Sequence, residues 1–130
     1  MTGIGPDPLG RVPDVLSGRP ELLERLETLV RRVEDGRLDR RILGLCRRRV
    51  GTLLGCPAHR GVIPARDRMD DRERACVDFA EQFVLAHHDI TDDDARRVTS
   101  HLSDAEMVAL TTALAVYDGF CRFEIMFSGG

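Results

Sequence analysis

Apolar residues recur at intervals of three and four along most of the chain, which is the spacing of one face of an α-helix. Each apolar stretch is bounded by residues that start or stop helices. The predicted helices run from Pro20 to Gly36, from about Leu38 to Gly55, from Asp70 through Val84, from Thr91 to Leu102 and from Ser103 to Phe127. No segment alternates like a strand between hairpin turns. The pattern predicts an all-α fold, a helical bundle of five or six helices.

Two of these helices begin with a reciprocal capping signal. Asp70 with Glu73, and Ser103 with Glu106, have the spacing at which an N-cap side chain and a third-position carboxylate satisfy each other's backbone N–H groups. The last helix has no strong breaker except Gly119, and at ~1.5 Å per residue it extends about 36 Å. Because its apolar residues occupy more than one face, it must be covered from several sides.

The first eighteen residues differ in composition from the rest of the chain. Residues 1–18 contain seven glycines and prolines, which indicates an extended N-terminal arm rather than a regular helix. We expect this arm to lie on a surface, such as that of a neighbouring subunit. By length, residues 19–130 form one helical domain.

Charge and composition restrict the classes of partner. The chain has 42% apolar and 32% charged residues and no apolar run near the ~20 residues of a membrane span. Residues 31–49 carry eight arginines against three acids, and residues 89–106 carry six acids against two arginines, so the second segment is expected to neutralise the first within or between subunits. Since the basic stretch lacks aromatics, nucleic acid is not an expected partner. The first ten residues lack the features of a secretory signal, which favours a cytoplasmic location.

The tetrapeptide CPAH, which follows the second predicted helix, holds the main candidate chemistry. Proline is favoured at the first helical position, so Pro57 predicts a short helix with Cys56 at its N-cap, where the positive helix end stabilises a thiolate. Gly61 and Pro64 limit that helix to about two turns. His59 follows one turn later as a candidate base. Cys56 and His59 are therefore the candidate catalytic residues.

The three other cysteines are expected to be structural. Cys46, Cys76 and Cys121 lie on apolar faces of predicted helices, where a free cysteine is usually a small buried hydrophobe. Their spacing fits no zinc pattern, so we expect no metal and no cofactor. A thiol from a facing helix, either Cys76 or Cys121, stays open as a partner for Cys56.

Three stretches carry a resemblance to a known family: RRILGLCRRRVGTLLGC, DDRERACVDFAEQFVLAHHDITDDDARRV and LSDAEMVALTTALAVYDGFCRF. Together they cover more than half of the chain, which resembles the carboxymuconolactone decarboxylase and alkylhydroperoxidase D-like superfamily. The resemblance implies an all-helical protomer that assembles into a homo-oligomer, a trimer or hexamer, with a dimer as a further alternative.

The same resemblance implies a thiol-dependent, peroxidase-like oxidoreductase, with departures at its motif. Cys56 matches the first cysteine of the family's C-x-x-C pair, and His59 stands at the second. Ile63 falls where the family has a histidine, and Gly44 falls near the expected glutamate. The chain is thus similar to a divergent member that lacks the C-x-x-C pair and its proton relay.

Two alternatives to a peroxidase stay open. The first is a catalytically degenerate oligomer that binds a small-molecule ligand or acts as a scaffold. The second is a cofactor-free decarboxylase or isomerase in which His59 acts as acid or base. Arg122, where relatives often carry arginine, and Tyr117 are the candidate substrate-binding residues. For Arg122 we favour a buried or interfacial salt bridge, and for Tyr117 a core position with a satisfied hydroxyl.

Overall fold

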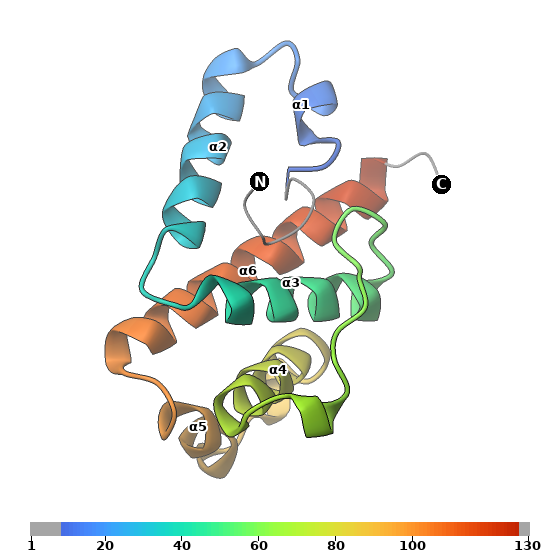
Figure 1. Cartoon of the computed structure of the whole chain (residues 1–130). Coiled ribbons are helices and arrows are strands. Elements are labelled where there is room, and N and C mark those ends of the chain that lie inside the picture. The colour runs from blue at the N-terminus through green and yellow to red at the C-terminus, as the bar shows by residue number, and fades with distance from the viewer. Residues whose placement is uncertain (1–8, 128–130) are drawn as a thin grey trace.

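The computed structural model describes residues 9–127, and every regular element in that range is helical (Figure 1). The α-helices are α1 (Val12–Val15), α2 (Pro20–Glu34), α3 (Arg40–Leu54), α4 (Asp71–Leu85), α5 (Asp92–Thr99) and α6 (Asp104–Phe127), with 3-10 turns η1 (Arg66–Arg68) and η2 (His87–Asp89). The prediction of an all-α fold is confirmed, with six α-helices in the described residues.

Helix α6 is the element around which the others are arranged. It packs against α1, α2, α3 and α4, and α3 packs in turn against α4. In Figure 1, α3 crosses α6, with α4 and α5 on one side of the crossing and α1 and α2 on the other. The fully buried residues at the centre of the main core include Leu43, Leu45, Cys46, Val50, Cys76, Ala80, Leu110, Ala113 and Leu114. The last helix is therefore covered from several sides, as its sequence predicts.

Both predicted capping boxes are present. The Asp70 carboxylate accepts the Glu73 backbone N–H at 2.7 Å, and the Glu73 carboxylate accepts the Asp70 N–H at 2.9 Å. Ser103 and Glu106 exchange the same two hydrogen bonds at 2.9 and 3.1 Å. Helix α6 continues without interruption through Gly119. The caps thus fix where α4 and α6 begin.

The N-terminal segment differs from the prediction in conformation and in contacts. Residues 12–15 form the single helical turn α1 instead of an extended arm. Leu9 and Val12 pack against Val30 and Phe120 in a second, smaller apolar group, which we call the N-terminal cluster. The described part of the arm therefore lies on its own protomer, because these apolar side chains are covered by α2 and α6. Residues 1–8 lie outside the described residues.

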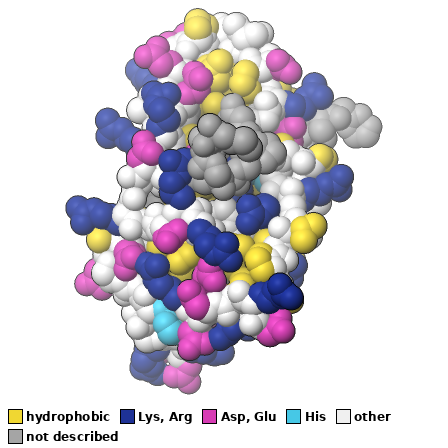
Figure 2. Space-filling model, in the orientation of Figure 1, with side chains coloured by type: hydrophobic (Ala, Val, Ile, Leu, Met, Phe, Trp, Pro, Cys, Tyr) yellow, Lys and Arg dark blue, Asp and Glu magenta, His cyan; other side chains and the backbone are white. Residues whose placement is uncertain are grey.

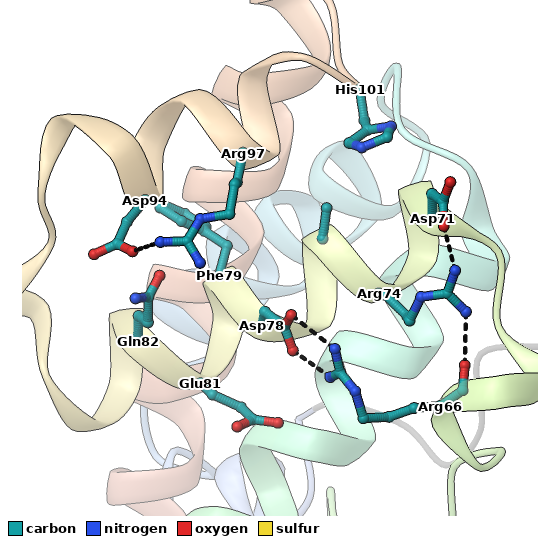
Figure 3. Close-up of a pocket in the computed structure, with 11 residues that line it drawn as sticks. Arg66, Asp71, Arg74, Asp78, Phe79, Glu81, Gln82, Asp94, Arg97 and His101 are labelled. Carbon is teal, nitrogen blue, oxygen red and sulfur yellow. Dashed lines mark hydrogen bonds and ion pairs between the residues drawn. The ribbon is translucent and has the colours of Figure 1, made fainter.

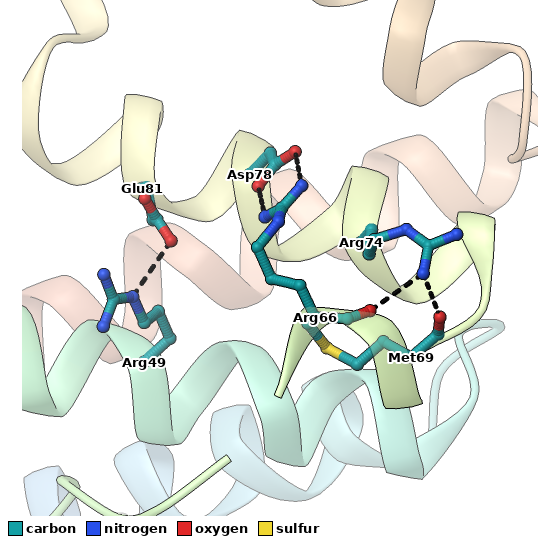
Figure 4. Close-up of polar contacts among 6 residues, drawn as sticks. All are labelled: Arg49, Arg66, Met69, Arg74, Asp78 and Glu81. Carbon is teal, nitrogen blue, oxygen red and sulfur yellow. Dashed lines mark hydrogen bonds and ion pairs between the residues drawn. The ribbon is translucent and has the colours of Figure 1, made fainter. Parts of the chain in front are cut away.

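Ion pairs connect the basic helix α3 to α4 rather than to residues 89–106. Arg41 pairs with Glu73, and Arg49 Nε lies 3.0 Å from the Glu81 carboxylate (Figure 4). Within the chain, these two arginines are therefore neutralised by α4, which lies directly against α3, and neutralisation by residues 89–106 between subunits stays a prediction. Figure 2 shows basic and acidic side chains interspersed on the face that it presents. Among the described helices, none has the length and apolar character to cross a membrane.

Candidate functional site

Cys56 lies in the junction between α3 and α4, as predicted, but no helix begins at Pro57. Residues 57–59 form a turn in which the backbone N–H groups of His59 and Arg60 donate to the Cys56 carbonyl at 3.2 and 2.9 Å. We call residues 56–60 the thiol turn. The predicted helix N-terminus behind the sulfur is therefore absent, and the positive charge near this site must come from another group.

Two glycines let the thiol turn fold back onto α3. Gly55 ends the helix in the left-handed conformation, with φ of 70°, and the Cys56 N–H donates to the Gly51 carbonyl at 2.8 Å. A Cβ added at Gly51 would lie 2.7 Å from the Cβ of His59, and closer still to the backbone of residues 59 and 60. Only glycine allows this approach of the turn to the helix.

The fold brings a third residue to Cys56 and His59. The Sγ atoms of Cys56 and Cys121 and a ring nitrogen of His59 all lie within 4.8 Å of one another. Both cysteines are fully buried, and His59 is 2% exposed. We call these three residues the thiol cluster. Of the two partners that the sequence left open for Cys56, Cys121 is the one in this cluster.

A buried arginine on α3 adjoins the thiol cluster. Arg47 is 1% exposed, and its Nε–H donates to Nδ1 of His59 at 3.1 Å. Its Nη2 lies 3.5 Å from the carbonyl of Ala58. Because guanidinium only donates, Nδ1 accepts, and a neutral His59 ring then carries its proton on Nε2. The missed signal is the helical spacing that places Arg47 between the inward-facing Leu43 and Val50.

Burial governs the ionisation of the cysteines that face the core. It raises the pKa of Cys121, and the neighbouring Cys56 sulfur raises that pKa further, while Arg47 opposes both effects. Cys121 is therefore a protonated thiol at neutral pH. Burial also raises the pKa of Cys46, and it raises the pKa of Cys76 to about 11. These last two thiols are fully buried and fit the predicted structural role.

Tyr117 is a core residue whose hydroxyl is hydrogen-bonded. The phenol donates to the buried Glu34 carboxylate at 3.4 Å, and its ring centroid lies 6.4 Å from that of His59. Burial raises the pKa of the Tyr117 hydroxyl, and the Glu34 charge raises it further. Tyr117 thus lies beside the thiol cluster with a neutral hydroxyl, and that hydroxyl already donates its hydrogen bond to Glu34.

Arg122 follows Cys121 in sequence but projects from a different face of α6. Its side chain is 57% exposed, and its Nε lies 3.2 and 3.1 Å from the two carboxylate oxygens of Asp118, one turn earlier. The favoured salt bridge was expected to be buried or at an interface, whereas this ion pair is exposed and lies within α6, and Arg122 does not join the thiol cluster.

A pocket of about 460 Å³ lies elsewhere, between η1, α4 and α5 (Figure 3). Its arginines are engaged within the protein: Arg66 pairs with Asp78, and Arg97 pairs with Asp94. Arg74 donates to the backbone carbonyl of Arg66 at 2.8 Å, which ties η1 to α4 (Figure 4). The pocket includes no residue of the thiol cluster; the Arg66–Asp78 pair joins η1 to α4, whereas the Arg97–Asp94 pair lies within α5.

Comparison with protein-family models finds no match to the chain, and comparison with curated proteins finds none either. The family relationship therefore stays a prediction from the three sequence stretches, and the function must be argued from the site itself.

Proposed function

We propose that the protein is a thiol-dependent oxidoreductase of the peroxidase type in which Cys56 and Cys121 form the redox pair. The observation that carries this proposal is that the two Sγ atoms lie within 4.8 Å of each other. A disulfide requires an S–S distance of about 2.05 Å, so rotation of the two side chains and a small backbone shift must close the remainder. Helix α6 thus supplies the second thiol that the sequence near Cys56 lacks.

The cycle consumes a hydroperoxide and an external dithiol. The Cys56 thiol gives up its proton, the thiolate attacks the terminal peroxide oxygen, and the O–O bond breaks. The leaving alkoxide takes up that proton and departs as the alcohol, and Cys56 becomes a sulfenic acid. The Cys121 thiol then attacks the Cys56 sulfur and expels the hydroxyl, which leaves as water with the thiol proton. An external dithiol reduces the resulting disulfide and is itself oxidised. Burial raises the pKa of Cys121, so its thiol still carries the proton that the departing hydroxyl takes up as the sulfur attacks.

Arg47 and His59 assist this chemistry in different ways. The buried guanidinium of Arg47 offsets the negative charge of a thiolate in the cluster, a role that the absent helix N-terminus does not fill. With Nδ1 accepting from Arg47, His59 presents an Nε2–H donor rather than a general base. A guanidinium at 3.1 Å also opposes a positive charge on the ring, and this disfavours the alternative acid-base enzyme. Free thiols require a reducing compartment, so we place the protein in the cytoplasm.

The test is to map the disulfide formed by an oxidant. Reduced protein is treated with one equivalent of tert-butyl hydroperoxide, alkylated and cleaved at arginine, and its peptides are analysed by mass spectrometry. We expect a Cys56–Cys121 linkage in the wild type. In Cys121→Ser we expect a Cys56 sulfenic acid that reacts with dimedone.

Two variants complete the experiment. Cys76→Ser removes another buried thiol of the core and should behave as the wild type does, in both linkage and peroxide consumption with dithiothreitol. Cys56→Ser should consume peroxide no faster than the dithiol alone. If wild type and Cys56→Ser consume peroxide at equal rates, the proposal is wrong.

A second candidate function is a helical oligomer that serves as a scaffold or ligand-binding subunit. The observation that favours it is a set of exposed apolar side chains on α2 and α6. These are Leu22, Leu29, Val108, Ile125, Met126 and Phe127. Sedimentation equilibrium of the wild type and of Leu29→Glu tests assembly. A wild-type oligomer that dissociates in the variant, together with thiols unchanged by peroxide, would replace the first proposal with this one.

A further inference from the structure

We infer that Cys56, His59 and Cys121 also form a buried, three-coordinate site for Cu(I). The inference goes beyond the proposed oxidoreductase function and does not rest on it, because metal binding requires only that the two thiols are reduced. Two residues come from the thiol turn and the third from α6, so the site exists only in the folded chain.

The spacing of the donor atoms suits one ion. The two sulfurs and a ring nitrogen lie within 4.8 Å of one another, before any metal draws them together. Metal–sulfur bonds of about 2.3 Å place the two sulfurs of a trigonal site about 4.0 Å apart. The donors therefore need to approach by about an ångström at most, a shift that side-chain rotation provides.

The donor types and their number favour Cu(I) over Zn(II). Thiolate sulfur is a soft ligand that selects Cu(I), zinc and iron–sulfur clusters, and imidazole suits copper and zinc. Zinc in proteins is almost always four-coordinate, so here it would need a fourth donor or a water. Among the described residues the group holds three donors, all at least 98% buried. Three donors that are shielded from solvent, two of them soft thiolates, fit the trigonal coordination of Cu(I).

Metal binding must also release one hydrogen bond. A neutral imidazole that binds a metal through one nitrogen carries its proton on the other, so neither nitrogen can accept from Arg47. The Arg47 Nε to His59 Nδ1 bond therefore breaks when the ion binds. The guanidinium charge stays beside the cluster, where it offsets the net negative charge of two thiolates on Cu(I).

The experiment is an anaerobic titration of the fully reduced chain with Cu(I) against bathocuproine disulfonate, a coloured competing chelator. We expect one ion per chain. Cys56→Ser, Cys121→Ser and His59→Ala should each weaken binding at least tenfold, whereas Cys46→Ser and Cys76→Ser should leave it unchanged. X-ray absorption should show two sulfurs and one nitrogen. Because Cu(I) is diamagnetic, the ¹⁵N shifts of the His59 ring should report its loss of the Arg47 bond.

Several results would overturn the inference. They are a stoichiometry below one Cu(I) ion per chain, unchanged Cu(I) affinity in Cys121→Ser, or an oxygen atom as a fourth ligand in the X-ray absorption spectrum. Tighter binding of Zn(II) than of Cu(I) would also overturn it. Circular dichroism checks the fold of each variant. If a variant does not fold, wild-type protein oxidised to the Cys56–Cys121 disulfide, or alkylated at these two thiols, serves instead and must bind no Cu(I). Peroxide consumption is measured separately, so copper binding without peroxidase activity, or the reverse, separates the two proposals.

Discussion

Arg47 Nε and His59 Nδ1 lie 3.1 Å apart in a part of the core from which solvent is almost excluded. This hydrogen bond joins the middle of α3 to the thiol turn that follows it. A hydrogen bond to a charged group contributes about 1.5–3 kcal/mol, more than a neutral one, because the charged donor gains more from its partner. The contact therefore holds the imidazole in a defined tautomer beside the two sulfurs.

Replacing Arg47 by methionine should lower the free energy of unfolding by about 2 kcal/mol. The substitution keeps a long side chain but leaves the buried acceptor on His59 without this donor. Arg49→Met is the matched control on the same helix, since its ion pair with Glu81 is about one-third exposed and contributes less than ~1 kcal/mol. Urea unfolding followed by circular dichroism measures both. Equal losses would show that the buried bond adds nothing.

Two glycine-to-alanine substitutions should change stability in opposite directions. In Gly51→Ala the new methyl overlaps the thiol turn, so we expect a loss of about 1–3 kcal/mol and little Cys56–Cys121 disulfide after oxidation. In Gly119→Ala the methyl meets no atom within 4 Å, and helix propensity should raise stability by about 1 kcal/mol. Thermal unfolding reports both. A stable Gly51→Ala protein that still forms the disulfide would mean that the turn can move at little cost.

Removing the Glu124 carboxylate should expose Cys56 to reagents. Glu124 accepts the backbone N–H of Arg11 at 2.7 Å and lies against Gly10, which in turn adjoins Ala58 of the thiol turn. Loss of one such hydrogen bond, about 1–1.5 kcal/mol, should make local opening about tenfold more frequent in Glu124→Ala. Iodoacetamide labelling followed by mass spectrometry measures this rate at Cys56.

Cys76 serves as the internal reference in that labelling experiment. Burial raises its pKa to about 11, so at pH 8 it should react slowly in both proteins. If Cys76 accelerates as much as Cys56, the variant has loosened the whole core rather than the N-terminal segment.

Acid should weaken the start of α5 through Asp94. The pKa of its carboxyl is lowered, chiefly by the Thr91 backbone N–H and then by the Gln82 side chain. The contribution is therefore complete above the ordinary carboxyl pKa near 4 and is lost as pH falls through the lower folded-state value. The urea midpoint should fall more steeply between pH 5 and pH 2 in the wild type than in Asp94→Asn. Asp92→Asn leaves the hydrogen bonds between Thr91 and Asp94 intact, so its urea midpoint should depend on pH as steeply as that of the wild type.

The helices could be predicted from sequence because their signals are local. Apolar spacing and the capping pairs at Asp70 and Ser103 act within one or two turns, and the structure has α4 and α6 where these signals place them. Pro57 misled the prediction, because the close approach at Gly51 turns the chain back before a helix can form.

The full set of site residues could not be predicted from sequence, because it depends on how helices that are distant in the chain pack together. Cys121 meets Cys56 only because α6 crosses α3, and an apolar stripe predicts burial without naming its neighbours. Arg47 lies on the buried face of α3 with Leu43 and Val50, although a charged side chain usually faces solvent. Its burial is tolerated because His59 and Ala58 accept its hydrogen bonds.

The N-terminal cluster has four buried members, far fewer than the main core, and together with the hydrogen bond from Arg11 to Glu124 it fastens residues 9–16 to α6. The protein should therefore behave as two cooperative units of unequal strength. Amide hydrogens of α1 and of the first turns of α2 should exchange through a sub-global opening. Those of α3 and α4 should exchange only through global unfolding. Reagents and ions would then reach the sulfurs at the frequency of that partial unfolding, rather than by diffusion through a permanent channel.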